Sequence, residues 1–352
     1  KNKYYDIDIF ILFPYSYKTK PISNLLENSL KKTRFRYTRL KGSRDYFQTR
    51  FKGLTLELIP ILKIKKASEA KNITDISPLH VSYIRKAAKN KQNEIILAKT
   101  FCYSQDCYGA ESYIKGFSGY VLELLVSYYG SFISLLKQAT KWKISKKVSK
   151  KIIIDPSKHY KNERQIFNTV NESKLLSPLI LIDPVQKERN AASSLSEEKL
   201  LRFVKAAKSF LAKPSIKIFL KEKIEINKLR NEAKRKRLKF VAVNVLSTKT
   251  KVDIAGAKLK KFYEFLIFSL KKGGFNIINS VFDFNDNKTA YLYFMLKEPS
   301  KHQLIQGPPL SVDKKYISAF KKRWPKNFIK NSKLYAKSTR ENDTKKFIIK
   351  II

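Results

Sequence analysis

Two short apolar segments carry carboxylates whose spacing suits metal binding. Asp6 and Asp8 alternate with isoleucines, and Glu57 lies in a second apolar run. Side chains alternate between the two faces of a strand, so Asp6 and Asp8 share one face. The intervening Ile7 and Ile9 are then expected to point into a core. Adjacent anions are costly unless a cation lies between them, and Mg²⁺ prefers oxygen ligands, so the pattern predicts two-metal phosphoryl transfer.

The acidic strands alone do not decide the function, because an acidic pair beside isoleucines also occurs in solvent-facing strands. Further distinctive segments follow in order along the chain. They are DISPLH at 75–80, residues 94–99, YGAE at 108–111, GFSGY at 116–120, ELL at 123–125, YGSF at 129–132, IDPV at 182–185 and ERNAA at 188–192. With these segments the chain resembles the archaeal, class I CCA-adding enzymes, the tRNA nucleotidyltransferases of the polymerase-β-like superfamily. The resemblance runs from Asp6 to about Phe210 and continues more faintly toward Thr344.

The resemblance implies three catalytic carboxylates with Mg²⁺ as the cofactor. Asp6 and Asp8 would hold the metals, and Glu57 would help to orient or deprotonate the terminal hydroxyl of the primer. In the family the first carboxylate is commonly Glu and the third Asp, so Asp6 and Glu57 each differ by one methylene. Metal geometry is sensitive to a change of that size, which puts full activity in question.

The resemblance also implies a set of nucleotide-binding residues. Lys99 and Tyr108 would bind the incoming triphosphate, and Ser77 and His80 lie where the family places further nucleotide-binding groups. Arg189, together with phosphates of the tRNA, would read the Watson–Crick edge of the incoming base, accepting C and A and refusing G and U. Ordinary structural roles remain open: a solvent-exposed lysine, a structural histidine and a loop salt bridge for the arginine.

The expected activity is template-independent addition of C, C and A to the 3′ end of tRNA from CTP and ATP. The charge balance favours a nucleic-acid partner such as tRNA, because 74 Lys and Arg against 29 Asp and Glu leave a net charge of +45. An AT-rich genome would also enrich lysine, but it would not remove acidic residues. The alternatives are another polymerase-β-like enzyme, such as a poly(A) polymerase, and a non-catalytic RNA-binding fragment.

Hydropathy and cysteine content bear on the location of the protein. No stretch of 18 or more apolar residues occurs, so we expect no contact with a membrane. The only two cysteines, Cys102 and Cys107, are too few for a disulfide framework, and a reducing cytoplasm fits them.

The order of predicted elements indicates a multidomain α+β protein. We expect an incomplete nucleotidyltransferase palm at 1–92, a helical central domain for nucleotide and tRNA at 93–222, and a basic α+β tail domain for tRNA at 223–352. Strands are predicted at 3–13, 54–64, 152–154, 240–246, 276–284 and 290–297, and helices at 25–32, from 93 onward, after Ser118, at 197–210 and at 258–272. Residues 141–151 are expected to form a basic linker or helix end.

The start of the chain differs from the family pattern. Before its first carboxylate the family carries a helix, a strand and a Gly-Ser turn that grips the triphosphate, and this chain begins after them. We therefore expect either a separate polypeptide that supplies this segment or a truncated chain. Whether the chain forms a homodimer is left open.

Overall fold

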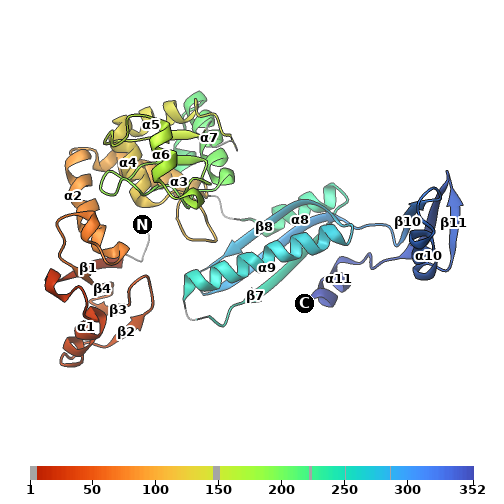
Figure 1. The fold of residues 1–352 in the computed structure, drawn as a ribbon, viewed down its shortest axis with the longest axis horizontal. Helices are drawn as coiled ribbons and strands as arrows, with labels where there is room; N and C mark the ends of the chain where they lie inside the picture. The colour runs from red at the N-terminus through yellow and green to blue at the C-terminus, as the bar shows by residue number, and fades with distance from the viewer. Residues whose placement is uncertain (1–5, 146–150, 222–223, 250, 286) are drawn as a thin grey trace. The chain divides into compact units, whose positions relative to one another are not determined.

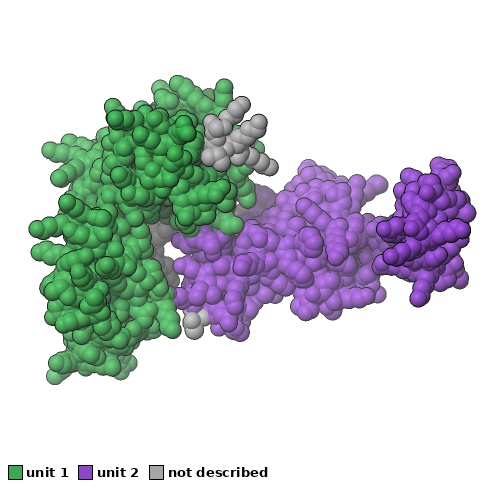
Figure 2. Space-filling view, in the orientation of Figure 1, with its two compact units in different colours: residues 1–110, 114–221 green, residues 111–113, 222–352 purple. Residues whose placement is uncertain are grey.

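The computed structural model describes residues 6–145, 151–221, 224–249, 251–285 and 287–352 (Figure 1). The chain divides into two compact units, which Figure 2 shows in different colours. Unit 1 comprises residues 1–110 and 114–221, and unit 2 comprises residues 111–113 and 222–352. Helices and strands occur in both units, which confirms the α+β fold class. The division into three domains at residues 92 and 222 stays a prediction.

A four-stranded mixed sheet with the order β1-β4-β3-β2 opens unit 1. Its strands are β1 (Asp6–Phe13), β2 (Tyr37–Leu40), β3 (Tyr46–Phe51) and β4 (Leu54–Leu62). β1 runs parallel to β4, whereas β3 runs antiparallel to both β4 and β2. The helix α1 (Ile22–Lys31) follows β1 and buries Ile22, Leu26 and Leu30, whose spacing of four places them on one face. β1 and β4 lie within the strands predicted at 3–13 and 54–64.

The buried core of this sheet covers less of β1 than expected. The buried cluster formed by Leu26, Leu30 and Phe47 packs against Ile11 and Phe13 of β1. These residues lie toward the carboxyl end of the strand, whereas Ile7 near its start is 40 % exposed. The prediction that Ile7 points into a core was therefore wrong, because alternation defines a face but not how far a neighbouring helix covers it.

Helices form most of the remainder of unit 1. They are α2 (Ser77–Ala87), α3 (Gln92–Ser104), α4 (Gly119–Tyr129), α5 (Phe132–Ala139), α6 (Glu163–Thr169) and α7 (Glu197–Ala212), with the parallel strands β5 (Ile152–Ile154) and β6 (Leu179–Leu181). A core built mainly from α3, α4, α5 and α7 includes Phe101, Phe132 and Phe203, all buried. Ile166 of α6 belongs to a separate buried cluster. Ser118 accepts a hydrogen bond from the Val121 amide and caps α4, which begins directly after this residue as predicted. Of the basic run 141–151, residues 146–150 lie outside the described residues, and 141–145 contain no helix.

α4 and α5 are the most apolar consecutive helices of unit 1. No single helix in the described part of the chain is long and apolar enough to cross a membrane, but α4 and α5 together pass a test of length and composition. They meet at a bend of 92°. Both supply buried side chains to the core, among them Leu125 and Leu135.

Unit 2 contains two antiparallel sheets with their helices. The first has the order β7-β9-β8, with β7 (Lys239–Leu246), β8 (Asn276–Phe284) and β9 (Thr289–Lys297), and is accompanied by α8 (Ile226–Arg235), α9 (Val252–Lys272) and the terminal α11 (Thr344–Ile351). The second has the order β10-β12-β11, with β10 (His302–Pro309), β11 (Asn327–Lys330), β12 (Lys333–Thr339) and α10 (Lys314–Arg323). α9 begins before the expected residue 258, because the buried Ala255 and Gly256 are too small to give a hydrophobic signal.

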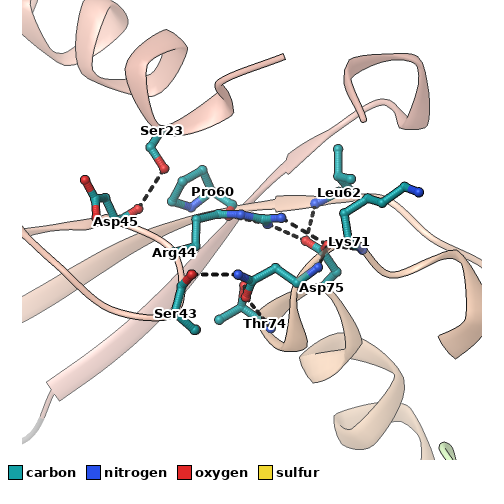
Figure 3. A network of polar contacts seen from close by, with 10 residues as sticks. Ser23, Ser43, Arg44, Asp45, Pro60, Leu62, Lys71, Thr74 and Asp75 are labelled. Atoms are coloured by element: carbon teal, nitrogen blue, oxygen red, sulfur yellow. Dashed lines mark hydrogen bonds and ion pairs between the residues drawn. The ribbon is translucent and has the colours of Figure 1, made fainter. Parts of the chain in front are cut away.

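A buried ion pair ties the end of β4 to the start of α2 (Figure 3). Asp75, in the 3₁₀ turn η3 (Ile73–Ile76), is fully buried and pairs with Arg44 through both guanidinium Nη atoms. Its carboxylate also accepts from the backbone amides of Leu62 at 2.9 Å, Lys71 at 3.1 Å and Asn72 at 3.0 Å. Burial raises the pKa of Asp75, but these donors, Arg44 foremost, lower it below its ordinary value. Asp75 is therefore ionised at neutral pH.

Replacing this carboxylate should destabilise unit 1. We expect Asp75→Asn to lower the free energy of unfolding by about 3 kcal/mol, because the largely buried Arg44 loses its counter-charge. Urea unfolding followed by tryptophan fluorescence in a Trp324→Phe background measures the effect, since Trp142 of unit 1 is then the only tryptophan. The control is Arg202→Ala, which breaks the exposed pair of Arg202 with Asp106 and should cost less than about 1 kcal/mol. Equal losses for both variants would contradict the assignment.

Candidate active site

Two of the three predicted catalytic carboxylates lie side by side on the first sheet. Asp8 of β1 and Glu57 of β4 are register partners in the parallel pair, and such partners point to the same face. Gln48, the partner of Glu57 on β3, donates its Nε2 to Glu57 Oε1 at 3.1 Å. The backbone of Asp6 belongs to β1, but the side chain of Asp6 lies outside the described part of the structure.

The carboxylate pair fits a hard cation by its chemistry. Asp8 and Glu57 offer carboxylate oxygens, the ligands that Mg²⁺ prefers, and Asp8 is exposed to solvent. Among the described side chains, which leave out Asp6, no three His, Cys, Asp or Glu residues are grouped to hold a metal ion. A complete carboxylate site would therefore need Asp6 beside Asp8 and Glu57.

A cleft of about 600 Å³ opens beside Asp8. Its walls come from β1, α2, α3 and α4, and they include Asp8, Ser77, His80, Tyr120 and Glu123. Two of the predicted nucleotide-binding residues, Ser77 and His80, thus share one cavity with a predicted catalytic carboxylate. The volume is sufficient for a small-molecule ligand.

Lys99 and Tyr108 meet at the amino end of α4. A Cβ atom at Gly119, the first residue of that helix, would lie 3.2 Å from Tyr108 Oη and 3.5 Å from Lys99 Nζ. Lys99 Nζ also pairs with Glu123 Oε1, one turn further along α4, at 2.7 Å. Helix amino ends favour anions because their first N–H groups lack partners within the helix. An ammonium, a hydroxyl and a helix amino end therefore converge where glycine leaves space.

Arg189 lies in the loop after β6 and pairs with Asp183. Its Nη1 is 2.5 Å from Asp183 Oδ2, and its side chain is 33 % exposed. His80 Nε2 lies 3.0 Å from the same oxygen, and Tyr120 donates its hydroxyl to Asp183 Oδ1 at 3.1 Å. The ring centroids of His80 and Tyr120 are 4.4 Å apart. The structure thus brings together two predicted residues, Arg189 and His80, around an aspartate that the sequence analysis had not assigned to the site.

The charge on Asp183 follows from this environment. Burial raises the pKa of Asp183, but the hydrogen bond from His80, the Val185 amide and the charge of Arg189 lower it to about 2. The ionised carboxylate can only accept hydrogen bonds, so His80 Nε2 must carry a proton. Burial and the nearby negative charge of Asp183 raise the pKa of Tyr120, which therefore stays a hydrogen-bond donor.

Comparison with known proteins assigns the chain to a family. The family model described as "tRNA nucleotidyltransferase, second domain" matches residues 93–220. The CCA-adding enzyme of Nanoarchaeum equitans is 37 % identical over 333 residues, which cover 94 % of this chain and 79 % of that protein. The chain belongs to the family of CCA-adding enzymes. The CCA-adding enzyme of Methanocaldococcus jannaschii is 33 % identical, with coverage of 96 % and 74 %.

Solved structures add a weaker likeness. A crystal structure of the Cid1 poly(U) polymerase has a TM-score of 0.45 and 11 % identity, over 62 % of this chain and 81 % of that chain. A cytoplasmic RNA terminal U-transferase has a TM-score of 0.44 and 12 % identity, with the same coverage. These scores are too low to indicate a shared function.

In this member of the family the predicted site residues remain predictions, and the structure describes the side chains of all of them except Asp6. Asp8 and Glu57 pair on the sheet, Ser77 and His80 line the cleft, Lys99 and Tyr108 meet at Gly119, and Arg189 binds Asp183. Tyr120, Glu123 and Asp183 were not among the site residues predicted from the sequence. The position of Asp183 directly after a buried apolar run was the available signal, because a charge there must find partners.

A side chain at Gly119 should weaken nucleotide binding. We expect Gly119→Ala to raise the KM for CTP by about tenfold, because the added methyl group fills the space between Tyr108 Oη and Lys99 Nζ. Steady-state incorporation of labelled CMP gives KM and kcat. The control is Tyr128→Phe at the exposed end of α4, which should leave KM unchanged. A normal KM for Gly119→Ala would exclude this position as a triphosphate site.

Protonation of Asp183 should destabilise unit 1 in acid. The folded-state pKa of Asp183, about 2, lies below the ordinary value of 3.8. The ionised carboxylate therefore stabilises the folded state fully above pH 3.8, and this stabilisation is lost as the pH falls through the folded-state pKa. The shift corresponds to about 2 kcal/mol. The free energy of unfolding of both proteins should fall between about pH 5 and pH 2. For Asp183→Asn the fall should be about 2 kcal/mol smaller than for the unaltered chain. Trp142 fluorescence in urea, again in the Trp324→Phe background, measures this difference, and identical pH dependence of the two proteins would refute the prediction.

Proposed function

We propose that this chain adds C, C and A to the 3′ end of tRNA, using CTP and ATP and no nucleic-acid template. The relatives that support this activity match most of the chain and are named CCA-adding enzymes. The observation that carries the proposal is the pair of Asp8 and Glu57 on one sheet face, beside a cleft that also contains Ser77 and His80.

Asp6, Asp8 and Glu57 would hold Mg²⁺ at this face. When bound, the metal supplies activation of the attacking hydroxyl and charge stabilisation of the leaving pyrophosphate. The protein's own contribution is orientation. Gln48 fixes the carboxylate of Glu57 through its hydrogen bond, and the β1–β4 register fixes its position relative to Asp8.

The nucleotide would bind with its phosphates toward the amino end of α4. Lys99 offers an ammonium to the triphosphate, Tyr108 offers a hydroxyl, and Gly119 leaves room for the phosphate oxygens. Ser77 and His80 bind the nucleotide along the cleft wall. Arg189 reads the base edge, since a guanidinium presents several N–H donors in one plane.

The tRNA would bind through phosphate contacts made by basic side chains of unit 2. Two helices of this unit expose many lysines and arginines. On α8 they are Lys228, Arg230, Lys234 and Arg235, and on α10 they are Lys314, Lys315, Lys321, Lys322 and Arg323. Neutralising phosphates in this way makes affinity fall as salt rises. A cytoplasmic location completes the proposal, and it suits the two free thiols of Cys102 and Cys107.

Removing one catalytic carboxylate should separate chemistry from tRNA binding. We expect Asp8→Asn to reduce CMP incorporation by at least about a hundredfold, equivalent to about 2.7 kcal/mol of transition-state stabilisation. Fluorescence anisotropy with labelled tRNA should show unchanged affinity, because the phosphate contacts lie elsewhere. The control, Asp283→Asn on β8 of unit 2, should retain incorporation. Parallel loss of affinity and incorporation in Asp8→Asn would count against a catalytic role.

A further inference from the structure

We propose that Asp183 is a positioning residue for nucleotide selection: it holds Arg189, and His80 and Tyr120 orient the Asp183 carboxylate. This inference rests on the proposed function, because it assumes that Arg189 contacts the incoming base. It adds a residue that holds the base-reading group and one wall of the cleft in a single arrangement.

The carboxylate of Asp183 divides its two oxygens between distinct sets of partners. Oδ2 binds Arg189 Nη1 at 2.5 Å and His80 Nε2 at 3.0 Å. Oδ1 accepts from Tyr120 Oη at 3.1 Å and from the Val185 amide at 2.9 Å. Because a carboxylate is planar, this division fixes the directions in which its partners lie.

The loop between Asp183 and Arg189 is closed by the same two residues. The Asp183 amide donates to the Arg189 carbonyl at 3.0 Å, and the Arg189 amide donates to the Gln186 carbonyl at 2.9 Å. Arg189 is therefore held to residue 183 by both its backbone and its side chain. A guanidinium is rigid and planar, so the contact at Nη1 and the tether to the side chain together restrict how its other N–H groups are presented.

Burial distinguishes a positioning role from direct contact with the nucleotide. Asp183 is fully buried, whereas the side chain of Arg189 is 33 % exposed and that of His80 is 15 % exposed. His80 and Tyr120 line the cleft, but Asp183 is not among its lining residues. Any effect of Asp183 on nucleotide choice must therefore pass through its partners.

Asp75 provides a matched comparison. Both aspartates are fully buried, and both pair with an arginine and accept backbone amides. None of the hydrogen-bond partners of Asp75, namely Arg44, Leu62, Lys71 and Asn72, is among the described residues that line the cleft. A purely stabilising role for Asp183 would make the two asparagine variants behave alike toward nucleotides.

The test compares CMP and UMP incorporation by Asp183→Asn, Asp75→Asn and the unaltered chain. Asp183→Asn keeps the size of the side chain but removes the charge that holds Arg189. We expect the ratio of kcat/KM for CTP to that for UTP to fall by about tenfold, with most of the change in the KM for CTP. Asp75→Asn should keep this ratio within about twofold of normal.

A double-mutant cycle tests whether the effect passes through Arg189. In an Arg189→Ala background, Asp183→Asn should leave the CTP to UTP ratio unchanged, because the group that it positions is already absent. Independent, additive effects of the two substitutions would overturn the inference. So would an unchanged ratio in a folded Asp183→Asn single variant, with folding checked by Trp142 fluorescence.

Tyr120→Phe keeps the test decisive if Asp183→Asn does not fold. This variant removes only the hydrogen bond to Asp183 Oδ1 and retains the ring that packs against His80. It should lower the CTP to UTP ratio by about threefold, and an unchanged ratio would overturn the inference. Failure of the unaltered chain to incorporate either nucleotide would instead overturn the proposed function, on which this inference rests.

Discussion

A carboxylate that is buried away from water must be surrounded by cations or hydrogen-bond donors, and this constraint organises unit 1. Asp75 and Asp183 are both fully buried, and each gathers donors from segments far apart in the sequence. Asp75 joins Arg44 and the end of β4 to the turn before α2. Asp183 joins His80 of α2 to Arg189 of a later loop. α2 is thus tied to the first sheet at its start and, through His80 and Asp183, to the loop that carries Arg189.

The first sheet imposes a second constraint through its register. Alternation along β1 decides which face Asp8 occupies, but only the parallel pairing with β4 decides that Glu57 is its neighbour. A slip of one residue would move Glu57 to the opposite face. The hydrogen bond from Gln48 on β3 adds a third strand to the arrangement, so the carboxylate pair depends on three strands together.

Local pattern predicted the elements whose signals are strong. β1, β4, β5, α7 and the start of α4 after Ser118 were expected close to their observed positions, since alternation and apolar runs are local properties. β2 and β3 were not assigned, because both strands are short and mix aromatic with polar residues, so neither forms the apolar run that marked β1 and β4. The exposure of Ile7 was also missed, since it depends on where α1 packs.

The candidate site was only partly predictable for the same reason. The residue types of Asp8, Lys99 and Arg189 could be recognised from the motifs around them. The partners of the site residues could not be recognised in this way. Lys99 and Glu123 are separated by 24 residues, and His80 and Asp183 by 103. Such pairs arise only when helices and loops pack, and no local pattern encodes them.

The most direct test of the proposed function is the sequence that the protein adds to RNA. The unaltered chain would be incubated with Mg²⁺, all four nucleoside triphosphates and a tRNA that lacks its three terminal nucleotides, and the 3′ ends would be sequenced. We expect addition of C, C and A, after which addition stops. A homopolymer tail, or tRNA binding without any addition, would contradict the proposed function.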